Sequence, residues 1–201
     1  MDTLIILDWD DTLFPTSWVV KNKINLRDAR VKSKLSFLFG TLDKILKRLL
    51  TMLLSHGDVI IITNAMPEWV DTSLTVLPMT EKIMREHIDV VSARKLYQYR
   101  VETIDWKKHA FRTHFSKFYQ DRDGYQNIIS AGDAEYERRA LIHLYGWDNH
   151  QPGRRFLKTI KFMKGPTFTS LIDQLVVITG SIGKVISVRK HVELHFDQIA
   201  R

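Results

Sequence analysis

Short apolar runs that alternate with longer helical segments are the feature that most limits what this chain can fold into. The first run, Leu4–Leu7, contains four large apolar residues in a row. Such a run is typical of a strand buried on both faces, and buried strands that alternate with helices predict a parallel sheet. We expect strands over residues 4–7, 58–64, 88–93, 127–133 and 156–162, and residues 184–196 alternate like an edge strand or hairpin arm.

The segments between these runs show the spacing and the end signals of helices. Apolar residues recur at helical spacing in residues 41–56, with Thr41 as the expected N-cap and Gly57 as the stop. Further helices are expected over residues 67–77, 79–87, 104–119, 135–145 and 166–178. Residues 14–40 are expected to form a flap, a short hairpin or a small helical insert in place of a full cap domain. We therefore predict an α/β fold with a doubly wound, Rossmann-like parallel sheet of about five strands, flanked by helices, in a single domain of residues 1–201 that ends in an edge strand near residues 184–201.

The composition excludes several classes of protein. The chain is 44% hydrophobic and 26% charged, as is usual for a globular domain, and it contains no cysteine. The lack of cysteine excludes disulfides, thiol nucleophiles and cysteine-ligated zinc, and it suits an intracellular protein, cytoplasmic or nuclear. No apolar run approaches the length of a membrane span, so we expect no membrane partner.

The net charge of +7 favours anionic partners through the overall field. However, the basic residues are spread over residues 21–34, 154–164 and 184–190, without one arginine-rich block. This spread favours a solvated basic surface over a nucleic-acid interface, which stays an alternative.

A cluster of acids follows the first strand directly. Asp8, Asp10 and Asp11 come directly before Thr12. Carboxylates so close together repel one another. Such a cluster is best explained by a bound cation or by a catalytic role. Residues two apart at a strand end point the same way, so Asp8 and Asp10 can face one ligand while Asp11 is turned aside. In open α/β sheets, ligands bind beyond the carboxyl ends of the strands. The alternative is that these acids only form a turn and cap the next element.

Three further motifs follow the acid cluster in order, and with it they resemble the haloacid dehalogenase-like superfamily of phosphohydrolases. The first motif is DWDDT, at residues 8–12, after an apolar strand. The second is VIIIT, which ends at Thr63; the third is a lysine near a helix start, Lys107 in DWKKHAF; and the fourth is IISAGDAEYE, with Asp133 and Glu137. The resemblance spans residues 4–162, and each motif lies at an expected strand or helix end.

The resemblance implies a Mg²⁺ cofactor and a division of roles among these residues. Asp8 would attack phosphorus and form an aspartyl-phosphate, and Asp10 would act as general acid and base. The metal would be held by Asp8, Asp133 and the backbone carbonyl of Asp10. The phosphate would be held by Thr63, Asn64 and Lys107, while Thr12 and Glu137 would support the site.

The residues themselves leave alternatives at several of these positions. Lys108 and Lys95 compete with Lys107 for the role of the active-site lysine, and Glu135 competes with Glu137. Thr63 and Asp133 also fit the simpler role of capping the next element.

We therefore expect a phosphatase that hydrolyses a phosphomonoester. An aspartate at the second position of the first motif favours hydrolysis over the other reactions of the family. Neither residues 13–59 nor residues 93–107 leave room for a full cap domain, and the resulting open site suits a macromolecular substrate such as a phosphoprotein or nucleic-acid end. The alternative is a catalytically weak module that binds nucleic acid or a phosphoprotein through its basic surface. A phosphotransferase would differ from the phosphatase only in the acceptor.

Overall fold

The computed structural model describes residues 3–119, 126–147 and 155–196. Its strands are β1 (Thr3–Leu7), β2 (Asp58–Thr63), β3 (Asp89–Ser92), β4 (Asn127–Gly132), β5 (Phe156–Lys161) and β6 (Val192–His195). Its helices are α1 (Thr16–Lys21), α2 (Ala29–His56), α3 (Pro67–Leu74), α4 (Pro78–His87), α5 (Ala93–Tyr97), α6 (Trp106–Tyr119), α7 (Glu135–Trp147) and α8 (Phe168–Ser187), with a short 3₁₀ helix, η1 (Thr103–Asp105).

The strands form one sheet in the order β3-β2-β1-β4-β5-β6, and all neighbouring pairs are parallel. This confirms the predicted α/β fold with a parallel, doubly wound sheet, although the sheet has six strands where about five were expected. The central strand β1 pairs Leu7 with Ile61 of β2 and with Ala131 of β4. The ends of β1, β2 and β4 therefore lie side by side at one edge of the sheet.

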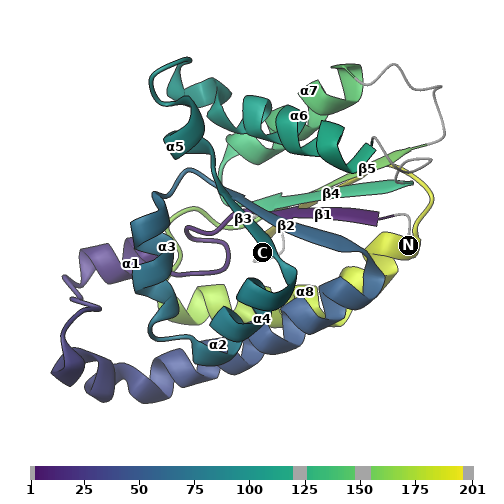
Figure 1. Cartoon of the computed structure of the whole chain (residues 1–201). Helices are drawn as coiled ribbons and strands as arrows, with labels where there is room; N and C mark the ends of the chain where they lie inside the picture. Colours follow the sequence, from purple (N-terminus) through teal and green to yellow (C-terminus); the bar gives the residue numbers. More distant parts are fainter. Residues whose placement is uncertain (1–2, 120–125, 148–154, 197–201) are drawn as a thin grey trace.

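Helices cover both faces of the sheet (Figure 1). Side chains alternate along β1, so Ile5 and Leu7 pack into the cluster that includes α2, α3, α4 and α8, while Leu4 and Ile6 pack into the cluster that includes α6 and α7. All five residues of β1 are buried. The apolar runs of the sequence are thus strands buried between two helical layers, as their composition predicts.

The segment of residues 14–40 forms α1, a loop and the first turns of α2. It is therefore helical, as one of the predicted alternatives has it, and the short hairpin is wrong. Helix α2 begins at Ala29, and its N-cap is Asp28, whose side chain accepts a hydrogen bond from the backbone N–H of Arg30. Thr41, the expected N-cap, lies inside the helix and donates its hydroxyl to the carbonyl oxygen of Phe37.

The end of the chain also differs from its prediction. Helix α8 continues through Gly180 and Gly183 to Ser187, because it packs along α2. The last strand, β6, is therefore only Val192–His195, shorter than the expected alternating segment. It pairs in parallel with β5 at the edge of the sheet, so the edge-strand prediction is confirmed and the hairpin arm is wrong.

Among the described helices, α8 alone has the length and apolar composition that could cross a membrane. The expectation that no apolar run approaches a span is therefore wrong in this narrow sense. In this fold α8 lies against α2, and Leu171, Leu175 and Ile178 are buried in the core. Core helices pass the same test of length and composition, so α8 is weak evidence for a span.

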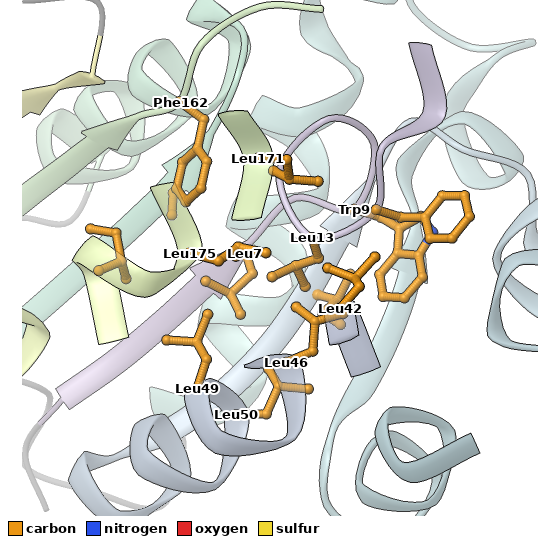
Figure 2. Close-up of a cluster of buried hydrophobic side chains, with 14 of the residues drawn as sticks. Leu7, Trp9, Leu13, Leu42, Leu46, Leu49, Leu50, Phe162, Leu171 and Leu175 are labelled. Atoms are coloured by element: carbon orange, nitrogen blue, oxygen red, sulfur yellow. The ribbon is translucent and has the colours of Figure 1, made fainter. Parts of the chain in front are cut away.

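The loop between β1 and α1 packs against the hydrophobic core (Figure 2). Leu7, Trp9 and Leu13 belong to the same buried cluster as Leu42 and Leu46 of α2. The Trp9 indole also donates a hydrogen bond of 3.0 Å to the Ser73 hydroxyl, so α3 is tied to the loop. The apolar residues of this loop are therefore fixed in the core, which fixes the backbone that carries its acids.

Candidate active site

The candidate site lies where β1, β2 and β4 end. The backbone N–H of Asp8 donates to the carbonyl oxygen of Ala131 at 2.9 Å, which continues the pairing of β1 with β4 by one residue. Thr63 is the last residue of β2, and Asp133 directly follows β4. Lys107 is the second residue of α6. The four motifs of the sequence thus lie at one edge of the sheet.

A buried lysine joins the first and fourth motifs. The Lys107 ammonium lies 2.8 Å from Asp8 Oδ1 and also pairs with Glu137 Oε1. The side chains of Lys107, Asp8 and Glu137 are only 1%, 8% and 4% exposed. Burial alone would lower the pKa of Lys107, but the two carboxylates outweigh it and hold this pKa above its ordinary value. Lys107 is therefore a fixed cation in contact with Asp8.

Gly132 makes room for this arrangement. A Cβ atom at Gly132 would lie 2.3 Å from Cγ and 2.4 Å from Cδ of Glu137. The Glu137 carboxyl therefore lies directly against the backbone at the end of β4. This close approach explains why glycine precedes Asp133.

Asp10 has two donors of its own. Its Oδ1 accepts a hydrogen bond from the Thr16 hydroxyl and one of 2.9 Å from the Trp69 indole N–H. Burial raises the pKa of Asp10 and the nearby Asp8 adds to this, while the bonds from Thr16 and Trp69 oppose it, and the net direction is upward. A carboxyl with a raised pKa is suited to carry a proton.

The Asp11 carboxylate is held at the start of α1. It accepts hydrogen bonds from the backbone N–H of Ser17, at 2.8 Å, and from the Ser17 hydroxyl. The backbone of Asp11 is in the left-handed region, with φ of 54°, which Asp tolerates better than most residues. Asp11 therefore anchors the loop to the start of α1.

Asp133 lies in an electronegative environment. Burial, followed by the charges of Asp8 and Glu137, raises its pKa to about 7. The carbonyl oxygen of Asp133 accepts a hydrogen bond of 2.7 Å from Lys161 Nζ, which fixes the loop after β4. Carboxylates that repel one another in this way fit a hard divalent cation with oxygen ligands, and Mg²⁺ commonly takes only one or two carboxylates from the protein.

The metal set proposed from the sequence consists of the carboxylates of Asp8 and Asp133 and the backbone carbonyl of Asp10. Within the described part of the chain, no group of three or more His, Asp or Glu side chains is placed to hold a metal ion. The proposed set does not need such a group, since it uses two side chains and one carbonyl. The role of these residues as metal ligands stays a prediction.

The expected phosphate ligands on β2 and the following turn are at the same edge of the sheet. Thr63 is fully buried, and its hydroxyl oxygen accepts a hydrogen bond of 3.0 Å from the backbone N–H of Ala65. This is the turn-forming role that the sequence left open, and it leaves the hydroxyl hydrogen free to donate to another group. Asn64 Oδ1 and Thr12 Oγ1 are buried without a hydrogen-bond partner among the described residues. Thr12 is fully buried within the loop.

The competing residues lie elsewhere. Lys108 pairs with Asp105, on the preceding turn, and Lys95 is exposed on α5. Glu135 is exposed, whereas Glu137 is buried against Lys107. Of each set, the structure brings Lys107 and Glu137 to Asp8.

Three residues of the site were not predicted for it. Trp69 and Thr16 both donate to Asp10, and Lys161 holds the loop of Asp133. In the sequence, Thr16 follows the loop after β1 and Trp69 lies at the start of the helix after β2. These positions place both residues near the candidate site, but they do not reveal the bonds to Asp10. For Lys161, the signal was a cation at the end of β5.

In comparisons with models of known protein families, with curated proteins and with solved structures, the chain gives no match. The argument for function therefore depends on the motifs and on the geometry that joins them.

Proposed function

We propose that this chain is a Mg²⁺-dependent phosphatase that hydrolyses a phosphomonoester through an aspartyl-phosphate on Asp8. The observation that carries the proposal is the buried contact of Lys107 with Asp8 and Glu137. A buried cation next to a carboxylate can offset the charge of an incoming phosphate, which otherwise repels a carboxylate nucleophile. Bound Mg²⁺ would neutralise further phosphate charge at Asp8 and Asp133.

In the first step, a carboxylate oxygen of Asp8 attacks phosphorus while the bond from phosphorus to the leaving oxygen breaks. Asp10 donates a proton to that oxygen, so an alcohol leaves and Asp10 becomes a carboxylate. Thr16 and Trp69 donate to Asp10 and hold its carboxyl in place. The Thr63 hydroxyl and the Lys107 ammonium would bind the phosphoryl oxygens.

In the second step, Asp10 accepts a proton from water as the water oxygen attacks phosphorus. The bond between phosphorus and Asp8 breaks, which releases inorganic phosphate and restores the Asp8 carboxylate. The raised pKa of Asp10 supports both transfers, because a carboxyl with a raised pKa is a stronger base after it has given up its proton.

The short segments around the candidate site favour a large substrate, because they leave the site open. Between β1 and β2 the described chain forms only α1, a loop and α2, and between β3 and α6 it forms only α5 and η1 with their connections. A groove of about 550 Å³ lies beside Trp69 and is lined by Lys23, Arg27 and Met66 among others. Lys23 and Arg27 outnumber the one acid in this lining, Glu68, and Trp69 links the groove to Asp10. This excess of positive charge favours a substrate that carries further negative charge, such as a phosphoprotein or a nucleic-acid end.

The test is release of p-nitrophenol from p-nitrophenyl phosphate with and without Mg²⁺. For Asp8→Asn we expect the Mg²⁺-dependent rate to fall by at least about 10³-fold, because the nucleophilic charge is lost. Asp11→Asn is the matched control, since the same change in the same loop leaves a carbonyl that accepts from Ser17, and its rate should stay within about threefold of native.

A rate that survives in Asp8→Asn would refute the mechanism. If the native protein turned over neither this ester nor phosphopeptides and phosphorylated oligonucleotides, the binding module would replace the enzyme as the better explanation. Transfer of phosphate to an acceptor other than water would show in the products.

A further inference from the structure

The outer face of α2 carries one sign of charge. Its exposed cations are Arg30, Lys34, Lys44, Lys47 and Arg48. The single acid in the helix, Asp43, is buried and accepts hydrogen bonds from two backbone N–H groups at the start of α4. The solvent face of this 28-residue helix therefore has five cations and no anion.

Large apolar side chains are exposed on the same side. Phe37 is 84% exposed, and its spacing of seven residues from Arg30 and from Lys44 places it on the same helix face as these cations. On the adjacent helix α8, Val176 and Val177 are 52% and 48% exposed. This side of the molecule therefore exposes apolar side chains together with positive charge, and exposed apolar patches rimmed by polar groups mark interaction sites.

Helices α2 and α8 form one continuous surface. They lie side by side under the sheet (Figure 1), and a groove of about 210 Å³ between them is lined by Arg48 and Ile45 from α2 and by Val176, Thr179 and Gly180 from α8. Among the exposed residues of the two helices, Asp173 is the one acid and Lys184 adds a further cation. We call this surface, made by the exposed residues of α2 and α8, the basic face.

We propose that the basic face binds the surface of an anionic phospholipid membrane. Its cations would lie among the lipid headgroups, and Phe37, Val176 and Val177 would enter the boundary of the acyl chains. A nucleic acid would pair with the cations but leave the apolar side chains in water. An anionic lipid surface with an apolar layer beneath it satisfies both kinds of side chain.

This inference replaces the expectation of no membrane partner, and it is independent of the proposed phosphatase activity. The expectation came from a search for a single spanning run. The basic face is instead assembled from two helices that lie more than a hundred residues apart in the sequence. The candidate active site is at an edge of the sheet and not on this face, so bound protein would keep the site open.

The experiment is co-sedimentation of the protein with vesicles of phosphatidylcholine alone and of phosphatidylcholine mixed with phosphatidylserine. We expect binding to the mixed vesicles only, weakened by added salt. The variant Lys44→Glu with Arg48→Glu should reduce the partition coefficient by at least about tenfold, since each cation near such a surface contributes about a fivefold factor. Phe37→Ser should reduce it by about tenfold through lost apolar burial.

The matched control is Arg94→Glu with Lys95→Glu, which changes the net charge equally on α5, on the opposite side of the sheet. It should bind vesicles nearly as the native protein does. Circular dichroism checks that each variant is folded, and Phe37→Ser changes a side chain that is already exposed.

Three outcomes would overturn the proposal. The first is no binding of the native protein to the mixed vesicles. The second is an equal loss in the α5 control, which would mean attraction by net charge alone. The third is native-like binding by Phe37→Ser together with displacement from vesicles by duplex DNA, which would assign the basic face to nucleic acid.

Discussion

Replacing Lys107 with methionine tests the central contact of the site through stability, without any assumption about substrate. Methionine has a similar length and fits an apolar environment, so the main change is the loss of the positive charge. The carboxylates of Asp8 and Glu137, 8% and 4% exposed, would then be buried without their cation. Removing one partner of a buried ion pair costs about 3–5 kcal/mol, because it leaves an uncompensated charge.

This cost is a large part of the stability of a domain, about 5–15 kcal/mol in total. In urea unfolding at pH 7 with a chelator present, a loss of about 4 kcal/mol with a slope of about 2 kcal/mol per molar would lower the midpoint by about 2 M. Lys108→Met is the matched control. Lys108 lies next in the sequence, but it is partly exposed and pairs with Asp105, so its removal should cost at most about 1 kcal/mol.

A second substitution separates charge from packing. Glu137→Gln in the Lys107→Met background removes one of the uncompensated charges, so it should restore at least about 1 kcal/mol. In the native background the same Glu137→Gln should destabilise, because it breaks the contact with Lys107. Equal midpoints for Lys107→Met and the native protein, or no recovery in the double variant, would refute the reasoning.

Other predictions concern the supports of the fold and the site. Asp43→Ala should lower the free energy of unfolding by about 1–2 kcal/mol because two N–H groups at the start of α4 lose their acceptor, while Asp43→Asn should cost less; thermal unfolding compares the two. Gly132→Ala should push Glu137 from its place and reduce both stability and phosphatase rate, and native-like values for both would contradict the close contact. Burial lowers the pKa of Lys158 from 10.5 to about 8, so the unfolded chain binds more protons between these values and the free energy of unfolding should rise with pH across them. Urea unfolding of Lys158→Met should show a flatter dependence over this range, and equal slopes would argue against the shift.

The sequence predicts most of the sheet because burial on both faces demands continuous apolar runs, and these are visible without a structure. It missed the first half of α2 because lysines interrupt the pattern there. Leu35, Phe39, Leu42 and Leu46 follow one another at steps of four and three, so the helical spacing was present before the expected start. The predicted end of α8, at residue 178, is too early because glycine disfavours a helix and Gly180 and Gly183 follow. Contact with α2 stabilises the helix beyond them.

Part of the candidate site could be predicted from the sequence and part could not. Asp8, Lys107 and Glu137 were predicted from the resemblance of the four motifs, and parallel strands bring the ends that carry such motifs together. Position alone left Lys108, Lys95 and Glu135 as alternatives. The bond from Trp69 to Asp10 was not predictable, because it depends on the direction in which α3 leaves β2. The basic face was missed for a similar reason: the distance between α2 and α8 is a property of the assembled core.

The position of β1 also determines when this chain can fold. Among the strands of this sheet it is synthesised first, yet it lies inside the sheet and pairs with β2 and with β4, where Thr3 lies opposite Asn127. Until β4 leaves the ribosome, one edge of the apolar sequence TLIIL has no partner strand, and such an edge recruits other chains. Pairing over so long a separation is slow, so the nascent protein spends its most aggregation-prone period with one edge of β1 unpaired. We expect fragments that end before Asn127 to be insoluble and to depend on chaperones.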